Sequence, residues 1–545
     1  MAETLTDVIG RHALRTPSRI ALIWLENGER EARSVTYAQL DLNVRVRAAG
    51  LCRAGLQQQN VLLQLNNGID FLESFLACLY AGVIPVPIAP PRPNRAPGAL
   101  VGIAQHAGAT ALVGGERELS ILRPMLGESL PSLMCLNVTE VDDSHEALCE
   151  ASPAEIAFLQ YTSGSTGAPR GVIITHSNLL SNEHAIQKTM ALSDQTVFVS
   201  WLPLYHDMGL IGGALQPLFL GVPCVLMSPL AFLQRPVRWL AAIGRYGATT
   251  SGAPNFAYDQ CVEKVTPEQR AGLKLSSWSV AFNGSEPVRR ATLERFAAAF
   301  ADCGFHRNSF FPCYGMAECT LLAAGVAPGV EPTFKHEGVS CGSAVENTQV
   351  RIVDPGLRRP LPEGEIGEIW ISGPAVSQGY YRNDPASAQV FGARLESEPA
   401  TNFLRTGDLG SIVDGSLFIE GRIKDVLVIR GRKVHPHDLE DTASQCNALL
   451  VRGGSVALQL EREDGEWLII VQEVTREGWR NANTHQLRGD IVQAISDEHG
   501  IQVREVLLVK PGRLPRTSSG KLRRSLCREM LQAGLFENAT CRSGG

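Results

Sequence analysis

Apolar and polar positions along the chain form blocks that predict helices and strands in alternation. After Thr36 the apolar residues have helical spacing, residues 60–65 predict a buried strand, and residues 68–82 predict the next helix. Helices that alternate with buried strands favour an α/β fold with parallel strands. Residues 85–98 are rich in proline and predict a surface loop rather than a domain boundary.

The pattern changes in the last quarter of the chain. Residues 411–433 predict a hairpin that turns at Asp414 and Gly415 and leads into a charged stretch. Short strand and helix patterns follow at 456–460, 467–474, about 485–499 and 504–510. These short runs predict a compact α+β unit.

We therefore predict two domains, in agreement with a length of 545 residues. A large α/β domain is expected at residues 1–424, and a small α+β domain at residues 425–545. The boundary is placed near Lys424 and Asp425. The alternative is one continuous domain with a hairpin at its edge.

Composition excludes several classes of protein. A net charge of −6 disfavours a dedicated nucleic-acid binder. No run of about 18 uncharged apolar residues is present, so no membrane span is expected. The first residues have no signal-peptide pattern. Thirteen cysteines without C-x-x-C pairs predict reduced, mostly buried thiols and no structural zinc. We expect a cytoplasmic protein with no nucleic-acid partner.

A phosphate-binding loop is predicted between the strand patterns at 156–161 and 171–175. Arg170 follows the loop, which differs from the G-x-x-x-x-G-K-[ST] pattern of the common P-loop. Backbone N–H groups and hydroxyls of such a loop can point at an anion. A polar surface turn is the alternative interpretation. The loop consists of six consecutive Ser, Thr or Gly residues: Thr162, Ser163, Gly164, Ser165, Thr166 and Gly167.

Further short motifs place chemically active residues in turns. Each motif alone is a weak signal, but all of them stand in one chain. They are Trp-Leu-Pro-Leu-Tyr-His-Asp-Met-Gly at 201–209, Gly-Ser-Glu-Pro at 284–287, Tyr-Gly-Met-Ala-Glu at 314–318, Thr-Gly-Asp at 406–408 and Ser-Ser-Gly-Lys at 518–521.

In this order the motifs resemble those of the adenylate-forming superfamily, which comprises acyl-CoA synthetases, adenylation domains and luciferases. The resemblance extends from about residue 5 to 530. It implies a large domain of sheets flanked by helices with a small barrel, and a small mobile C-terminal domain. It also implies ATP and Mg²⁺ as cofactors.

The resemblance implies a role for each motif residue. The loop of Thr162 to Gly167, with Arg170, would hold the β- and γ-phosphates of ATP. Glu318 would be the Mg²⁺-associated carboxylate, and Lys521 would bridge the substrate carboxylate and the α-phosphate. The remaining nucleotide contacts fall on the adenine-binding motifs Gly284, Ser285, Glu286, Pro287, Tyr314, Gly315, Met316 and Ala317, and on the ribose positions Asp408 and Arg422.

The chemistry explains these residue types. A carboxylate must attack the α-phosphorus of ATP although both groups are anionic, so the reaction needs cations where they meet. Mg²⁺ and Lys521 would supply them, and little acid–base work remains. A lysine on a separate small domain suggests a site that domain closure completes. A solvated lysine in a basic tail is the alternative.

Several details resemble fatty acyl-AMP ligases, which load fatty acids onto acyl carrier proteins. Ala317 stands where the superfamily usually has Thr. We predict a fatty acid substrate and an acyl carrier protein acting in trans. An acyl-CoA synthetase is the alternative, because Gly167 follows the general superfamily and residues 341–351 are short where these ligases carry an insertion. Residues 504–528 hold eight basic residues and one acid, which suits an acidic carrier.

A fatty acid substrate requires a binding site for its acyl chain. Residues 230–248 have an apolar helical pattern that would wall an acyl tunnel or form ordinary core. His206 is expected at the mouth of that tunnel. We predict no relay between His206 and Asp207, because neighbouring side chains in an extended segment diverge.

Two other classes compete with the ligase. A serine hydrolase is suggested by Gly-Val-Ser-Cys-Gly at 338–342, but neither a strand before it nor a helix after it is predicted. A non-catalytic nucleotide-binding module would keep the phosphate loop without needing Glu318, Asp408 and Lys521.

Overall fold

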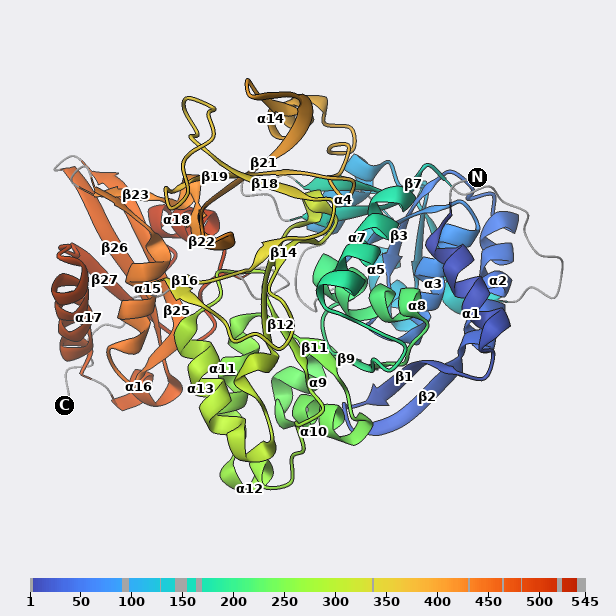
Figure 1. Cartoon of the computed structure of the whole chain (residues 1–545), viewed down its shortest axis with the longest axis horizontal. Helices are drawn as coiled ribbons and strands as arrows, with labels where there is room; N and C mark the ends of the chain where they lie inside the picture. The colour runs from blue at the N-terminus through green and yellow to red at the C-terminus, as the bar shows by residue number, and fades with distance from the viewer. Residues whose placement is uncertain are drawn as a thin grey trace. The chain divides into compact units, whose positions relative to one another are not determined.

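The computed structural model describes residues 3–90, 98–127, 129–142, 154–162, 169–335, 338–429, 432–462, 465–481, 483–516 and 522–536. Contacts divide the chain into two compact units, which are described separately (Figure 1). The larger unit comprises Met1–Gly164, Pro169–Thr406 and Gly410–Ile419. Of the described residues, the smaller unit comprises Gly407–Leu409 and those from Glu420 onward.

A nine-stranded sheet forms the centre of the larger unit. The neighbouring strands β1, β10, β9, β11, β12 and β13 are parallel. Antiparallel pairs extend the sheet at both ends: β2 pairs with β1, β14 with β13, and β17 with β14. The strands in spatial order are β17 (Ser343–Ala344), β14 (Leu322–Gly325), β13 (Phe310–Gly315), β12 (Val280–Asn283), β11 (Thr250–Gly252), β9 (Phe198–Ser200), β10 (Cys224–Met227), β1 (Ile20–Glu26) and β2 (Arg30–Thr36).

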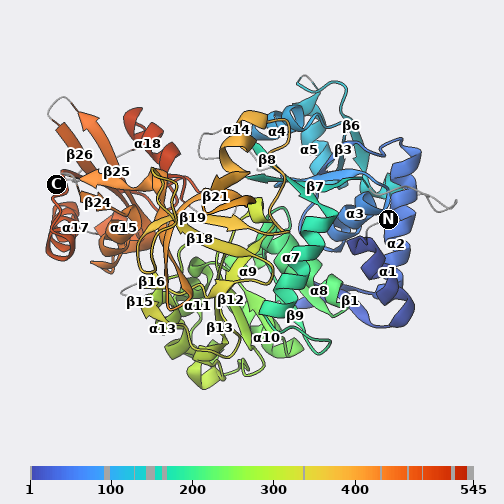
Figure 2. The same cartoon turned by 45° about the horizontal axis from the view of Figure 1, so that its top comes forward.

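Helices cover this sheet and bury its apolar side chains in one large core. Figure 2 shows α7 beside α8, with α10, α11 and α13 grouped near β12 and β13. The helices around the sheet are α1 (Leu5–Arg15), α7 (His176–Thr189), α8 (Gln216–Leu220), α9 (Pro229–Gln234), α10 (Val237–Tyr246), α11 (Asn255–Lys264), α12 (Pro267–Arg270) and α13 (Arg290–Phe300).

A second, four-stranded parallel sheet follows the pattern predicted from the first part of the chain. Its order is β4 (Ile84–Pro87), β3 (Asn60–Gln64), β5 (Ala111–Gly114) and β6 (Met134–Asn137). The helices before, between and after these strands are α2 (Tyr37–Arg53), α3 (Ile69–Tyr80), α4 (Gly98–Ala107), α5 (Glu116–Leu126) and α6 (Val138–Asp142). The predicted strand at 60–65 and helix at 68–82 are therefore confirmed.

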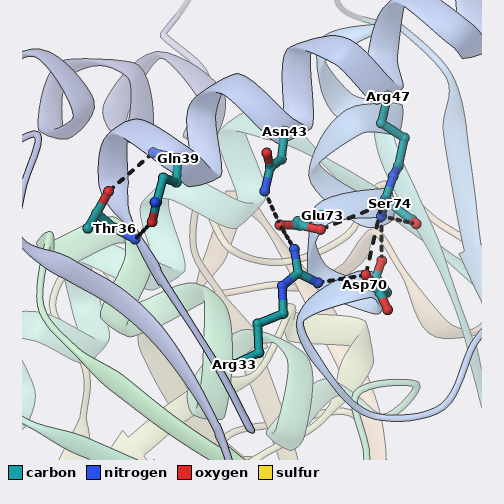
Figure 3. A network of polar contacts seen from close by, with 8 residues as sticks. All are labelled: Arg33, Thr36, Gln39, Asn43, Arg47, Asp70, Glu73 and Ser74. Atoms are coloured by element: carbon teal, nitrogen blue, oxygen red, sulfur yellow. Dashed lines mark hydrogen bonds and ion pairs between the residues drawn. The ribbon is translucent and has the colours of Figure 1, made fainter. Parts of the chain in front are cut away.

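A buried polar network ties β2 to α2 and α3 (Figure 3). Glu73 is 1% exposed and accepts hydrogen bonds from Arg33 Nη2 at 2.7 Å and Asn43 Nδ2 at 2.8 Å. Arg47, itself 4% exposed, lies 3.5 Å from the other Glu73 oxygen and donates to Ser74 Oγ at 2.9 Å. Two guanidinium groups thus compensate one buried carboxylate.

A third sheet has five strands, and most of its residues belong to the larger unit. It contains β18 (Gln349–Val353), β19 (Gly367–Ser372), β20 (Ala393–Leu395), β21 (Glu398–Val413) and β22 (Ser416–Arg422). Helix α14 (Asp384–Val390) lies between β19 and β20 in the chain. The predicted hairpin is confirmed, because Asp414 and Gly415 both have positive φ between the paired strands β21 and β22.

The smaller unit has its own sheet and core. Strands β25 (Leu450–Arg462), β26 (Gly465–Val474) and β27 (Glu505–Val509) pair in that order, and β23 (Leu427–Ile429) pairs with β24 (Arg432–Val434). Ile470, Ile491 and Leu508 are fully buried in its core. Its helices are α15 (Pro436–Gln445), α16 (Arg476–Asn481), α17 (Thr484–His499) and α18 (Arg524–Gln532).

The structure tests the expectations about membrane spans and cysteines. Among the described helices, none is both long and apolar enough to cross a membrane. Ten cysteines within the described residues are free thiols, most of them buried, whereas Cys52 is disulfide-bonded. The prediction of reduced, mostly buried thiols is therefore confirmed for these ten and wrong at Cys52.

Candidate active site

The predicted phosphate loop connects two strands of an antiparallel hairpin. Strand β7 (Ile156–Thr162) pairs with β8 (Arg170–Thr175), and Thr162 lies opposite Arg170 in the register. Both residues are half-buried. Ser163, Gly164, Ser165, Thr166 and Gly167 lie outside the described residues.

The other predicted motifs of the larger unit gather at one edge of the nine-stranded sheet. Strands β9, β11, β12 and β13 are parallel. The motif with His206 follows β9, Gly284–Pro287 follows β12, and Tyr314 to Glu318 lie at the end of β13. Carboxyl ends of parallel strands meet at one edge of a sheet, where ligands of α/β proteins bind.

Glu318 lies in a tight turn that requires a glycine at position 315. It belongs to a single 3₁₀ turn, η4 (Ala317–Cys319), after β13. A β-carbon on Gly315 would overlap the carbonyl oxygen of Leu321, so the backbone crosses itself closely here. Thr320 is fully buried with φ +67°, and its hydroxyl donates to the Ala375 carbonyl at 2.7 Å. Such strain in a β-branched residue is typical of functional sites.

Tyr380 links Glu318 to Arg170. Its hydroxyl donates to Oε1 of Glu318 at 2.8 Å, and Cζ of Arg170 lies 5.3 Å from the centre of its ring. Burial, and then the Glu318 carboxylate, raise the pKa of Tyr380 well above its usual value, and Arg170 opposes the shift in part. The structure thus joins two predicted residues through one that the sequence analysis missed. The available signal was Gly379-Tyr380-Tyr381 in a polar stretch.

The segment with His206 bends instead of continuing the strand. Asp207 has helical backbone angles, φ −48° and ψ −51°, and caps the π-helix η1 (Met208–Leu215). Nδ1 of His206 therefore lies 2.6 Å from Oδ1 of Asp207. The prediction that these side chains diverge is wrong, because it assumed extended backbone. A β-carbon on Gly209 would overlap the Pro203 carbonyl, so this turn also requires glycine.

The Gly284–Pro287 turn packs against the start of η1. Ser285 has φ +72°, and its hydroxyl contacts Met208 Sδ at 3.2 Å. Asn255 donates to the Pro287 carbonyl at 2.8 Å and fixes the far side of the turn. A β-carbon on Gly284 would lie 3.0 Å from Cys313 Sγ, so the turn also packs closely against β13.

The pKa of the Cys319 thiol depends on the carboxylates around these turns. Burial is the main cause that raises its pKa to about 12, and the carboxylates of Glu318 and Asp207 both add to the shift. Two carboxylates from η4 and from the cap of η1 therefore act on one thiol. Tyr314 and Ala317, at 8% and 3% exposure, pack into the cores beside it.

The two predicted ribose positions lie in the smaller unit and contact each other. Nε of Arg422 is 3.0 Å from Oδ1 of Asp408, whose side chain is 10% exposed. Lys521 lies outside the described residues. The flanking residues Arg516 and Leu522 form a bridge, and Arg524 pairs with Glu440 and Asp425.

Residues 230–248 form α9 and α10, and their buried side chains pack as core. Phe232 and Trp239 are fully buried, and Trp201 stacks on Phe232 with 4.0 Å between ring centres. Trp239 in turn packs edge-on against Trp278. Aromatic side chains thus fill the inward face of this stretch. For these side chains the structure supports ordinary core packing rather than an acyl tunnel.

The serine of the hydrolase alternative has a structural role. Ser340 is 2% exposed, and its Oγ accepts a hydrogen bond from the Gly342 backbone at 3.0 Å. It follows the two-residue strand β16 (Gly338–Val339) and precedes β17 rather than a helix. A nucleophile elbow requires a strand before the serine and a helix after it. The hydrolase interpretation is therefore excluded at this motif.

Comparison with known proteins identifies the family. The model of the AMP-binding enzyme family matches residues 9–381, and that of the Disco-interacting protein 2-like AMP domain matches residues 424–536. The chain belongs to the AMP-binding enzyme family. Enzymes of this family use ATP, and the relatives described next are ligases.

Two curated relatives align with this AMP-binding enzyme over nearly its full length. The chain is 37% identical to the medium-chain-fatty-acid–[acyl-carrier-protein] ligase JamA of Moorena producens, over 98% of this chain and 96% of JamA. It is 36% identical to the ligase of the same description, TtuA, of Teredinibacter turnerae, over 95% and 92%.

Solved structures confirm the fold. A structure from studies of the fatty acyl-adenylate ligases of E. coli and L. pneumophila has a TM-score of 0.87 and 30% identity, over 98% of both chains. The L. pneumophila ligase in complex with acyl adenylate and pyrophosphate has a TM-score of 0.75 and 33% identity, over 99% of this chain and 98% of that one. The predicted α/β fold of the adenylate-forming type is confirmed.

Proposed function

We propose that this AMP-binding enzyme activates a fatty acid with ATP to fatty acyl-AMP and pyrophosphate. It then transfers the acyl group to the phosphopantetheine thiol of an acyl carrier protein in trans. The observation that carries the proposal is full-length similarity, at 36–37% identity, to two medium-chain fatty acid–carrier protein ligases. Glu318 and the Gly284–Pro287 turn lie at one sheet edge, and Tyr380 links Glu318 to Arg170, which supports the proposal.

Glu318 is proposed as the Mg²⁺-associated carboxylate. Within the described ranges no group of three His, Cys, Asp or Glu side chains could hold a metal ion, so a site built from protein ligands alone is not expected there. Mg²⁺ is commonly held by one carboxylate together with phosphates and water. The half-buried Glu318, oriented by Tyr380, fits that arrangement. When bound, the ion would neutralise phosphate charge.

We assign the nucleotide contacts motif by motif. We assign the β- and γ-phosphates to the loop Thr162–Gly167 with Arg170. We assign the adenine to Gly284–Pro287 and Tyr314–Ala317. The ribose hydroxyls would bind Asp408, which Arg422 orients through the ion pair at 3.0 Å.

Lys521 is proposed to bridge the substrate carboxylate and the α-phosphate. A flexible point charge suits this role, because it can follow the charge that develops during attack. We further propose that residues 425–545 act as the mobile domain, with a hinge at Lys424 and Asp425. The family models, which end at 381 and begin at 424, support a division in this region.

His206 is proposed to line the entrance for the acyl group. It lies at the turn into η1, and its ring is oriented by Asp207 at 2.6 Å. Trp201, five residues before His206, stacks on Phe232. The substrate would be a fatty acid whose carboxylate points to the sheet edge.

Transfer to CoA is the second candidate function. Residues 341–351 run directly from β17 into β18 (Gln349–Val353) without an insertion. A relative of Mycobacterium tuberculosis that is 32% identical is described as a putative fatty-acid–CoA ligase. Against this, exposed Arg504, Lys510 and Arg513 in the smaller unit suit an acidic carrier protein in the cytoplasm.

A product assay tests the proposal. The protein is incubated with ATP, Mg²⁺ and a series of fatty acids, and then divided between CoA and a phosphopantetheinylated carrier protein. Acyl-AMP that accumulates in the presence of CoA and disappears onto the carrier is the expected result. Efficient acyl-CoA formation would establish the second candidate, and no pyrophosphate release with any fatty acid would contradict both.

A further inference from the structure

Tyr380 lies on a segment that is attached to both halves of the proposed phosphate site. Gly379 accepts a backbone hydrogen bond from Ile173 at 3.1 Å, and Tyr381 donates one to Gly171 at 2.8 Å, so the segment extends the edge of β8. Ser377 N–H donates to the Glu318 carbonyl at 2.9 Å. Strand β8 and turn η4 are thus held at a fixed separation by main-chain bonds.

The side chain of Tyr380 repeats this link between the charged groups themselves. It is 4% exposed, and its hydroxyl reaches the Glu318 carboxylate while its ring faces the Arg170 guanidinium. Oε1 of Glu318 therefore has a buried hydroxyl donor at 2.8 Å that fixes the orientation of the carboxylate.

We propose that Tyr380 is a positioning residue that orients Glu318 and Arg170 toward one another, and thereby sets the affinity of the site for Mg²⁺–ATP. The inference rests on the proposed role of Glu318. Partners that orient a metal-associated carboxylate typically contribute tenfold to a hundredfold in metal affinity. Tyr380 does not touch the reacting atoms, so its effect is expected on Mg²⁺ dependence rather than on the attack itself.

The neighbouring tyrosine provides a matched control. The Tyr381 hydroxyl accepts a hydrogen bond from Asn60 Nδ2 at 2.9 Å, on β3. Tyr380→Phe and Tyr381→Phe each remove one hydroxyl from adjacent residues of the same segment. Only the first hydroxyl reaches Glu318.

The experiment is a calorimetric titration of ATP binding at increasing Mg²⁺, without fatty acid, together with a melting curve of each variant. Tyr380→Phe should raise the Mg²⁺ concentration for half-maximal binding about tenfold. Tyr381→Phe should leave it unchanged. With Glu318→Gln in place, Tyr380→Phe should add less than about a twofold further change, because coupled residues are not additive.

The outcomes separate this inference from the proposed function. If Glu318→Gln shifts the Mg²⁺ dependence and Tyr380→Phe behaves like Tyr381→Phe, the role of Tyr380 is overturned and that of Glu318 stands. If Glu318→Gln has no effect, both are overturned. Should Tyr380→Phe fail to fold, Arg170→Lys tests the link from its other end. Arg170→Lys keeps the charge and loses the planar contact, and unchanged Mg²⁺–ATP affinity would overturn the proposal.

Discussion

Gly315 passes so close to Leu321 that a β-carbon would overlap the Leu321 carbonyl oxygen. This crossing closes the turn that presents Glu318. Gly315→Ala must displace one of the two backbone segments, at a typical cost of about 1–3 kcal/mol in the free energy of unfolding. The displaced turn also moves the carboxylate, so pyrophosphate release should fall by much more than stability alone explains.

Urea unfolding and a pyrophosphate assay on the same preparations measure this difference. Gly489→Ala is the control, because nothing lies within 4 Å of the added carbon at that position of α17. It should be neutral or stabilising by about 0.5–1 kcal/mol. A Gly315→Ala enzyme with full activity would show that the turn does not fix Glu318.

The sequence predicted most of the fold because its strands and helices are local patterns. Residues 60–65 and 68–82 became β3 and α3 with small changes at their ends, since apolar spacing alone determines which face is buried. The turn at Asp414 and Gly415 was predictable because few residue types tolerate positive φ. These features depend on neighbours in the chain.

The contacts within the site depend on distant residues and were less predictable. Tyr380 reaches Glu318 across 62 positions of the sequence, and nothing local distinguishes it from Tyr381. The contact of His206 with Asp207 depends on a helical backbone angle that the motif does not reveal. The spacing of residues 230–248 was compatible with either ordinary core or the wall of an acyl tunnel. Phe232 and Trp239 are fully buried, which shows that these side chains form core.

The network around Glu73 predicts a large effect on stability far from the proposed site. Glu73→Gln removes the buried charge partner of Arg47, which is itself 4% exposed, and leaves it the more distant, 58% exposed Asp70 at 3.9 Å. Breaking a buried ion pair in this way typically costs about 3–5 kcal/mol. Urea unfolding should show a loss of this size, while activity per folded molecule stays close to the wild-type value.

An exposed pair provides the comparison for this loss. Arg30 and Glu26 form an ion pair on the surface, where both side chains are largely in water. Glu26→Gln should change the free energy of unfolding by less than about 1 kcal/mol. Equal effects of the Glu73 and Glu26 substitutions would contradict the importance of the buried network.

Lys521 carries the strongest prediction about chemistry. Lys521→Ala should lower fatty-acid-dependent pyrophosphate release by about a hundredfold or more, the usual result of removing one group that stabilises developing charge. ATP binding, measured by calorimetry, should remain. The exposed Lys264 gives the control substitution to alanine. Pyrophosphate release that is equal in both variants would remove Lys521 from the proposed mechanism.

Asp438 should make the stability of the protein depend on pH. Burial, and then the carboxylates of Glu420, Glu440 and Glu498, raise the pKa of Asp438 to about 6 in the folded state. His437 Nε2 lies 3.2 Å away. Because the folded form holds this proton more tightly than the unfolded form, the contribution of Asp438 falls as the pH rises from about 4 to about 6.

Asp438→Asn tests the sign of this effect. The amide cannot ionise, so the variant should be more stable than the wild type above pH 6, with a difference that shrinks toward pH 4. The gain will be smaller than the pKa alone suggests, because the Asp438 side chain is 46% exposed and water screens its neighbours. Urea unfolding of both proteins at several pH values measures the difference. A variant that is less stable than the wild type at pH 7, or a difference that does not change with pH, would show that an ionised Asp438 is favourable in the fold.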